Sequence, residues 1–307
     1  MRLVRWSRAR IVEVPNVVLV SALRRALRAR FHAFAGSLLD RRRAFPLRGK
    51  VLGAWLRTRD RGFVAEKSLP FGGRLVCRFA TPYEAMIWRG EEEDGELDVL
   101  ARLLSPGEAF ADCGANVGLW SITAAKLVGD RGTVFAIEPN PETVRHLEAN
   151  LTLSRVANVR VSVCAVGAAP ALARFEAGEF SNLGRLSAEG SASVPVRPLD
   201  EILGARPIAG LKIDVEGSEA AVLLGATAIL ERDAPWVFIE FNRAYATSDR
   251  LADWEPHAIL AARGYSPFRL PPPRSDARFG AAIDPMQFRT RRYVNVLYAK
   301  RPFELAR

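Results

Sequence analysis

A glycine-rich turn that begins with an acidic residue is the strongest chemical signal in the sequence. Residues 112–118 read Asp-Cys-Gly-Ala-Asn-Val-Gly and follow a short apolar run. Glycines at the end of a strand let a nucleotide approach the backbone. Gly114 and Gly118 provide this access, while Asn116 replaces the middle glycine of a dinucleotide-binding turn. Asp112 would repel a pyrophosphate and attract the sulfonium and ammonium groups of S-adenosylmethionine, so the turn predicts S-adenosyl-L-methionine as the cofactor.

Three further places along the sequence suit the same cofactor. Glu138 ends the next strand-like run, where a carboxylate accepts hydrogen bonds from both ribose hydroxyls. Asn140 either contacts the adenosine or only caps the helix that begins with Pro141. Ala165 ends a third strand-like run, where an adenine ring is expected, although core packing explains small residues there equally well. The predicted cofactor-binding residues are Asp112, Gly114, Asn116, Gly118, Glu138, Pro139, Asn140 and Ala165.

A second group of charged residues lies along a predicted interior strand at 211–215. Strand alternation puts Lys212, Asp214 and Glu216 on one side and apolar residues on the other. Buried charges are costly unless they open toward a binding site or pair with one another. Lys212 lies deeper and is expected to pair with a carboxylate. Asp214 and Glu216 lie at the carboxyl end of the strand, beside the predicted cofactor site.

These two carboxylates indicate the class of acceptor. Methyl transfer is an in-line displacement, so the protein mainly positions the acceptor and removes its proton. A carboxylate suits a hydroxyl acceptor, and we predict Asp214 and Glu216 as the catalytic residues, with the choice of proton acceptor between them open. Enzymes that methylate exocyclic amines of bases usually carry an Asn/Asp-Pro-Pro-aromatic segment here, whereas residues 214–217 read Asp-Val-Glu-Gly. This difference disfavours amino-group methylation of nucleic acid.

The remaining polar residues are less specific. Glu240 and Asn242 end a fifth strand-like run and either extend the same edge of the sheet or cap a strand in solvent, with equal weight. The three histidines, at positions 32, 146 and 257, lack the spacing of metal ligands. No metal site is therefore predicted.

Strand-like and helical runs alternate through the chain and would position these residues. The expected strands span 108–113, 133–137, 159–166, 211–215 and 236–241. The expected helices span 119–127, 142–153 and 219–230, followed by a helix at 256–263 and a last strand at 293–300. Short apolar strands separated by helices require right-handed crossovers and a parallel sheet covered on both faces. We predict a doubly wound, Rossmann-like α/β domain over residues 81–307.

The chain before this domain is strongly basic. Residues 1–75 hold eighteen Lys and Arg against four Asp and Glu, and the remaining residues hold twenty-six against thirty. Apolar residues recur at helical spacing from Leu19 to Phe34 between arginines, which predicts a basic amphipathic helix within a lobe over residues 1–80. Such a helix either lies on an acidic membrane face or packs its apolar stripe on the main domain.

Three features bear on the location of the protein. The apolar run 17–20 is cut short by Ser21 and by two arginines, which does not suit a secretory signal. No run reaches the length of a transmembrane helix. Three scattered cysteines are typical of reduced thiols. We expect a cytoplasmic protein, with peripheral contact at the inner membrane face if the basic helix binds lipid.

Taken together, the motifs resemble those of the FkbM-type methyltransferases between Tyr83 and Glu240. The matching segments are 112–118, 137–141, 165–167 and, above all, Leu-Lys-Ile-Asp-Val-Glu-Gly-Ser-Glu at 211–219. The resemblance implies a class I methyltransferase fold, a sheet of seven strands with the last one antiparallel, and oxygen as the acceptor. Cys113 stands where the family more often has an apolar residue. The basic lobe and the segment after Asn242 match the family poorly, and acceptor specificity would reside there.

The leading hypothesis is O-methylation of a hydroxyl on a sugar, glycolipid or secondary metabolite. One alternative is an RNA methyltransferase that uses the arginine-rich lobe to bind phosphates. Against it, the lobe lacks the exposed aromatic residues of a stacking platform, which disfavours nucleic acid as a partner. A second alternative is a membrane-associated scaffold without activity, in which the retained cofactor motifs would lack a reason.

Overall fold

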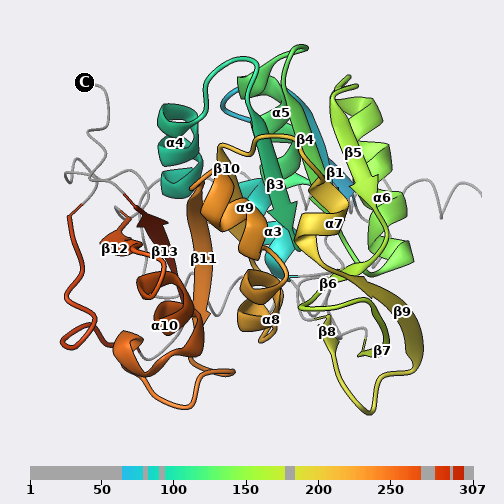
Figure 1. Ribbon diagram of the computed structural model, residues 1–307. Coiled ribbons are helices and arrows are strands. Elements are labelled where there is room, and N and C mark those ends of the chain that lie inside the picture. Colours follow the sequence, from blue (N-terminus) through green and yellow to red (C-terminus); the bar gives the residue numbers. More distant parts are fainter. Residues whose placement is uncertain are drawn as a thin grey trace, which may run out of the picture. The chain divides into compact units, whose positions relative to one another are not determined.

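The computed structural model describes residues 64–78, 82–89, 94–176, 184–270, 281–290 and 293–300. A seven-stranded sheet lies at its centre, in the strand order β12-β13-β11-β10-β3-β4-β5 (Figure 1). Its strands are β3 (Ala109–Cys113), β4 (Thr133–Ile137), β5 (Val159–Ser162), β10 (Gly210–Ile213), β11 (Trp236–Asn242), β12 (Ser266–Arg269) and β13 (Tyr293–Ala299). The strands from β11 to β5 pair in parallel, and β13 runs antiparallel to β11 and β12. This arrangement confirms the predicted doubly wound α/β fold with an antiparallel last strand.

Alternation along β3 divides the core between the two faces of the sheet. Ala109, Ala111 and Cys113 pack in one core cluster with buried residues of the helices that follow the small sheet. Phe110 instead stacks on Trp120 of α5, with ring centroids 6.4 Å apart. Burial of the whole strand is expected for a parallel strand with helices on both sides.

The helices are α3 (Pro82–Arg89), α4 (Asp94–Leu103), α5 (Leu119–Val128), α6 (Pro141–Leu153), α7 (Leu199–Leu203), α8 (Glu219–Leu224), α9 (Thr227–Arg232) and α10 (Glu255–Ala261), with a 3-10 turn η2 (Leu251–Asp253).

The third predicted strand, 159–166, is divided between two sheets. β5 ends at Ser162, whose carbonyl accepts the N–H of Glu138 at 3.1 Å, and the next residue, Val163, is exposed. β6 (Ala165–Val166) pairs instead with β9 in a four-stranded sheet ordered β6-β9-β7-β8, which we call the small sheet. Its other strands are β7 (Ala171–Glu176), β8 (Arg185–Leu186) and β9 (Ala192–Arg197). An apolar run does not itself show that its two halves join different sheets.

The predicted helix at 219–230 is also interrupted. α8 ends at Leu224 and α9 begins at Thr227. A Cβ at Gly225, between them, would lie 2.1 Å from the carbonyl oxygen of Gly167, so only glycine suits this close approach. The Gly225 carbonyl accepts the N–H of Asp200 at 2.9 Å, which ties the break to α7.

β1 (Val64–Ser68) and β2 (Arg74–Arg78) form an antiparallel hairpin that packs on α6. The N–H of Val76 donates to Asn150 Oδ1 at 2.9 Å. The hairpin belongs to the same compact unit as the rest of the described chain, residues 61–307. The predicted amphipathic helix lies outside the described residues, and the domain boundary at residue 80 stays a prediction. Among the described residues, no helix has both the length and the apolar character needed to span a membrane.

Candidate active site

The glycine-rich turn between β3 and α5 is built from three residues in the left-handed region of the backbone. Gly114, Asn116 and Gly118 have φ values of 84°, 47° and 97°. Glycine adopts this region without strain, and asparagine is among the residues that tolerate it best. Asn116, which departs from a three-glycine pattern, therefore keeps the backbone shape that a glycine would allow.

Both glycines also have close neighbours within the protein, and for Gly114 the neighbour is a backbone atom. A Cβ at Gly114 would lie 1.9 Å from the carbonyl oxygen of Asp214, and a Cβ at Gly118 would lie 2.6 Å from Cδ1 of Leu147. The turn is thus pressed against the end of β10 and against α6. Sequence reasoning explained these glycines by cofactor approach alone. The structure adds a packing role for each, and their contact with the cofactor stays a prediction.

Asp112 is fully buried on β3, and its carboxyl group contacts α5. Its Oδ2 accepts the Ser121 hydroxyl at 2.6 Å, while Oδ1 has no hydrogen-bond partner in the described part of the chain. Burial raises the pKa of Asp112, and the positive charge of Lys212 on the paired strand opposes that rise. Strand alternation turns this carboxyl group inward and leaves one of its oxygens unpartnered, and its contact with the cofactor stays a prediction.

Glu138 follows β4 and joins two loops of the predicted cofactor site. Its Oε2 accepts the N–H of Asn116 at 3.1 Å, and its Oε1 accepts the N–H of Asn140 at 2.9 Å. Burial raises the pKa of Glu138 to about 7, although both amide hydrogen bonds lower it. Each oxygen keeps a further lone pair that a ribose hydroxyl can use. Sequence reasoning found this residue but not its role in fixing the turn.

The other predicted cofactor residues have different surroundings. Asn140 caps α6, because its Oδ1 accepts the N–H of Glu142 at 2.9 Å, which confirms the capping interpretation. Pro139 is half-buried beside this cap. Ala165 is buried in the core of the small sheet and is not part of the seven-stranded sheet that carries the turn. Contact of these three residues with the cofactor stays a prediction.

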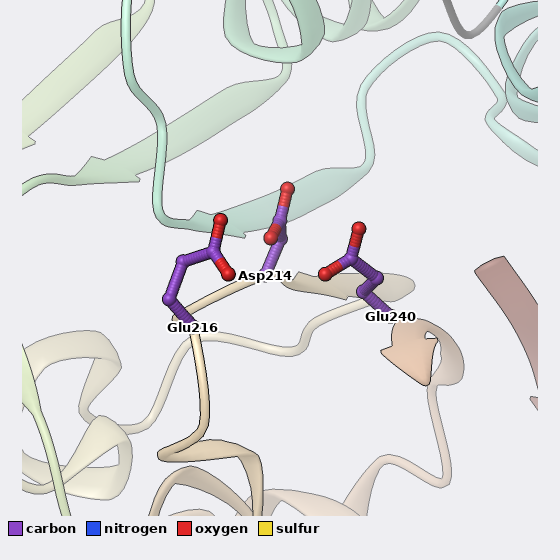
Figure 2. A group of neighbouring side chains, drawn as sticks. All are labelled: Asp214, Glu216 and Glu240. Carbon is purple, nitrogen blue, oxygen red and sulfur yellow. The ribbon is translucent and has the colours of Figure 1, made fainter. Parts of the chain in front are cut away.

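Three carboxylates meet where β10 and β11 end, and we call them the carboxylate cluster. Asp214 follows β10 directly, Glu216 comes two residues later, and Glu240 belongs to β11. One oxygen of each lies within 4.8 Å of the others, and Figure 2 shows the side chains pointing toward one another. Lys212 Nζ donates to Asp214 Oδ2 at 3.0 Å, which confirms that this lysine pairs with a carboxylate. The structure thus brings the two predicted catalytic residues together.

The sequence left open whether Glu240 and Asn242 lie in the site or in solvent. Glu240 is a member of the carboxylate cluster, and Asn242 contacts it. The Nδ2 of Asn242 donates to Glu240 Oε2 at 3.1 Å and to Glu216 Oε2 at 3.5 Å. Burial is the main cause that raises the pKa of Glu216 to about 7 and that of Glu240 to about 9. The charge of Asp214 raises both further. At neutral pH the cluster therefore holds at least one proton.

The carboxylate cluster is also, within the described ranges, the one group whose geometry suits a cation. Carboxylate oxygens are ligands of hard cations such as Mg²⁺ and Ca²⁺. The prediction of no metal site rested on the histidines. Of these, His146 contacts the carbonyl oxygen of Val76 at 3.0 Å and His257 contacts the hydroxyl of Tyr298 at 3.1 Å. The absence of a metal site therefore stays a prediction.

Sequence reasoning missed Tyr245, in the loop after β11. Its ring packs on Gly217, and its pKa is raised by burial and by the charge of Glu216, which place it beside the carboxylate cluster. A single tyrosine in a loop carries no periodicity that would mark it. Tyr245 comes three residues after Asn242, behind a strand that finishes in polar residues. This position is the signal that could have identified it.

Comparison with known proteins points to one family. The model of the methyltransferase FkbM domain matches residues 112–267. The hexuronic acid methyltransferase AglP of Haloferax volcanii is 28% identical over 182 residues, which cover 57% of this chain and 74% of that protein. A ribosomal RNA large subunit methyltransferase E of Alkalilimnicola ehrlichii is 48% identical over 46 residues, or 15% of this chain and 22% of that protein. The solved structure of a methyltransferase FkbM from Methylobacillus flagellatus is 17% identical, with a TM-score of 0.42, over 87% of this chain and 58% of that chain.

The segment matched by the family model makes up half of the chain. It contains the glycine-rich turn, Glu138, the carboxylate cluster and the strand segment at 211–219 on which the resemblance rested. The chain therefore belongs to the methyltransferase FkbM domain family, and its cofactor is S-adenosyl-L-methionine.

Proposed function

We propose that this methyltransferase methylates a hydroxyl oxygen of a sugar, a glycolipid or a glycosylated metabolite. The carboxylate cluster carries the proposal, because the contact between Gly114 and Asp214 holds it against the glycine-rich turn. A hydroxyl must lose its proton on methylation, so a proton acceptor beside the cofactor turn serves this reaction. The name of the Haloferax relative, a hexuronic acid methyltransferase, supports a sugar as the acceptor.

The residues around the turn suit S-adenosylmethionine. When bound, this cofactor supplies an electrophilic methyl group on a cationic sulfur. Asp112 Oδ1 and Asn116 Oδ1 are buried acceptors without a hydrogen-bond partner among the described residues. They would accept from the donor groups of the cofactor, and Glu138 would accept from its ribose hydroxyls. The carboxylate of Asp112 also matches the positive charge of this ligand.

Among the three carboxylates, Glu216 is best suited to take the proton of the acceptor. Asp214 is paired with Lys212 at 3.0 Å. The pKa of Glu240, raised to about 9, keeps that group protonated at neutral pH. Glu216, with its pKa raised to about 7, is ionised in a large share of the molecules near neutral pH, where a base of matched pKa is most efficient. In this proposal Glu216 accepts the hydroxyl proton.

An RNA acceptor has weaker support. The similarity to the ribosomal RNA methyltransferase covers 46 residues, or 15% of this chain. The arginine-rich residues that would bind phosphates lie outside the described ranges. In a scaffold without activity, the unpartnered acceptor atoms of Asp112 and Asn116 would have no ligand to bind.

Transfer of a radiolabelled methyl group to a panel of acceptors tests the proposal. The panel contains glycosides of glucuronic and galacturonic acid, neutral hexosides and total RNA. We expect label in the sugars, in a linkage that survives mild alkali, because methyl ethers resist alkali and methyl esters do not. Label lost in alkali would show that the acceptor is a carboxyl group. Label confined to RNA would show that the acceptor is RNA and not a sugar.

Two variants make this experiment specific. Glu216→Gln should lose transfer while it binds S-adenosylhomocysteine as wild type does in calorimetry. Glu148→Gln, an exposed residue of α6, should leave both properties unchanged. A wild-type protein that is folded but binds no S-adenosylhomocysteine would contradict the whole proposal.

A further inference from the structure

Asn150 of α6 joins the β1–β2 hairpin to the glycine-rich turn. Its side-chain oxygen Oδ1 accepts the N–H of Val76 in β2 at 2.9 Å, and its Nδ2 donates to the carbonyl oxygen of Val117 in the turn at 2.9 Å. The side chain is fully buried, so water does not compete for either contact. One amide group therefore links the hairpin and the turn through two buried hydrogen bonds.

The two partners also fix which end of the amide faces the turn. Val76 offers an N–H, and Val117 offers a carbonyl oxygen. A reversed amide would place donor against donor and acceptor against acceptor, and unpaired polar groups in a buried place are costly. The contact with the hairpin thus ensures that Asn150 presents an N–H to the turn.

Two neighbours of Asn150 on α6 contact the hairpin as well. His146 and Ser154 lie four residues before and after it, which places the three side chains in one row along the helix. His146 Nε2 lies 3.0 Å from the carbonyl oxygen of Val76, and the hydroxyl of Ser154 accepts the N–H of Arg74 at 2.9 Å. Within the described ranges, Asn150 is the member of this row that also hydrogen-bonds to the turn.

The part of the turn that Asn150 contacts has a demanding backbone shape. Val117 lies between Asn116, with a φ of 47°, and Gly118, with a φ of 97°. On the side of β4, Glu138 holds this part through the N–H of Asn116 at 3.1 Å. On the side of α6, Asn150 holds it through the Val117 carbonyl oxygen. Loss of this donor would leave the carbonyl of a buried residue without its partner and allow the turn to leave its shape.

We propose that Asn150 is a positioning residue for S-adenosyl-L-methionine, which holds the turn at 116–118 in the shape that binds the cofactor. The hairpin supports this role because it orients the Asn150 amide. It precedes residues 112–267, the segment that matches the family model, so cofactor binding in this chain depends on a segment outside that match. The acceptor takes no part in this inference, which stands or falls independently of sugar methylation.

Calorimetry with S-adenosylhomocysteine on the full-length protein is the first test. Asn150→Leu removes both hydrogen bonds and nearly fills the same space, and it should weaken binding roughly tenfold, a usual size for coupling between two sites. Ser154→Ala is the matched control, because it loses a hairpin contact and leaves the turn untouched. It should lose stability in urea but bind as wild type does. Wild-type affinity in Asn150→Leu, or an equal loss in both variants, would reduce Asn150 to an anchor of the hairpin and overturn the proposal.

The carbonyl resonance of Val117 reports the contact itself. The sequence contains three Val–Gly pairs, at 117–118, 128–129 and 166–167. Labelling with carbon-13 at the valine carbonyl and nitrogen-15 at glycine therefore leaves three coupled resonances, and Val128→Ile and Val166→Ile identify two of them. The third should move upfield in Asn150→Leu, as a carbonyl does when it loses a donor, and stay in place in Ser154→Ala. A resonance that Asn150→Leu leaves unmoved would contradict the role of Asn150.

A measurement on the wild-type protein covers variants that do not fold. Coupling between two sites is reciprocal, so bound S-adenosylhomocysteine should strengthen the contact of Asn150 with the turn. Exchange of the Asn150 side-chain amide hydrogens with solvent should therefore slow when the ligand saturates the protein. The side-chain amide of Asn158, which donates to the carbonyl oxygens of Ala125 and Gly129 at 3.0 Å each, is the internal control and should exchange at one rate throughout. An Asn150 rate that the ligand does not change, or an equal slowing at Asn158, would overturn the proposal.

Discussion

The carbonyl oxygen of Asp214 occupies the space that a side chain at position 114 would need. A Cβ built on Gly114 would lie 1.9 Å from this oxygen. The oxygen belongs to the backbone, so it cannot rotate away as the end of a side chain would. The contact fixes the distance between the turn that is expected to hold the cofactor and the strand end that carries the carboxylate cluster.

We expect Gly114→Ala to lower the free energy of unfolding by about 3 kcal/mol or more, measured by urea denaturation. A left-handed alanine costs about 1 kcal/mol, and forced overpacking costs about 1–3 kcal/mol more. Gly264→Ala is the matched control, since Gly264 has a φ of 79° and nothing lies within 4 Å of its added Cβ. It should lose about 1 kcal/mol, from backbone strain alone. Equal losses in the two variants would show that the contact with Asp214 relaxes freely.

Asp112→Asn should weaken the binding of S-adenosylmethionine by roughly tenfold, or about 1.4 kcal/mol. The amide keeps the shape of the carboxyl group but removes the buried negative charge next to the turn. Calorimetry with S-adenosylmethionine and with S-adenosylhomocysteine measures the effect. The loss should be larger for S-adenosylmethionine, because only this ligand carries the sulfonium charge. Asp130→Asn, an exposed control in the loop after α5, should bind both ligands as wild type does. Equal affinity of Asp112→Asn and wild type would remove Asp112 from the cofactor site.

The sequence sufficed for the features that depend on local pattern. Alternation along the strand at 211–215 put Lys212 and Asp214 on the same side, and the structure pairs them at 3.0 Å. The capping role of Asn140 also followed from local chemistry, because a cap acts within a few residues.

Contacts between distant segments could not be read in this way. Glu240 joins the cluster because β11 pairs with β10, and neither strand alone reveals its neighbour. Ala165 lies in the small sheet because the pairing of β5 in the seven-stranded sheet ends at Ser162. The apolar residues on either side of this break give no sign of it in the sequence. Tyr245 lies beside the cluster because its loop packs on Gly217 of another loop, so no single segment predicted it.

Glu240→Gln should stabilise the protein at alkaline pH. Burial raises the pKa of Glu240 to about 9 in the folded chain, whereas an unfolded glutamate titrates at about 4.3. Between these two pKa values the folded chain binds a proton that the unfolded chain has lost. The contribution of Glu240 to stability is therefore complete below pH ~4 and is lost as the pH rises through about 9. Unfolding measured from pH 5 to pH 9 should show a shallower loss of stability in Glu240→Gln than in wild type. Glu148→Gln should follow wild type, and parallel curves for all three proteins would contradict the burial of a proton at Glu240.

The pH dependence of catalysis should identify Glu216 as the proton acceptor. Its carboxyl group is protonated below its pKa of about 7 and cannot take a proton there, so kcat/KM should rise with pH and level off above about 7. Glu138 has a similar pKa of about 7, and the rise alone does not distinguish the two residues. Glu216→Gln should lower kcat by roughly 10²–10⁴-fold and remove this rise, measured with the sugar acceptor that the panel identifies. Its affinity for S-adenosylhomocysteine should stay that of wild type. If Glu216→Gln keeps both its rate and the rise near pH 7, the proton leaves by another route, and the carboxylate cluster serves only to position the acceptor.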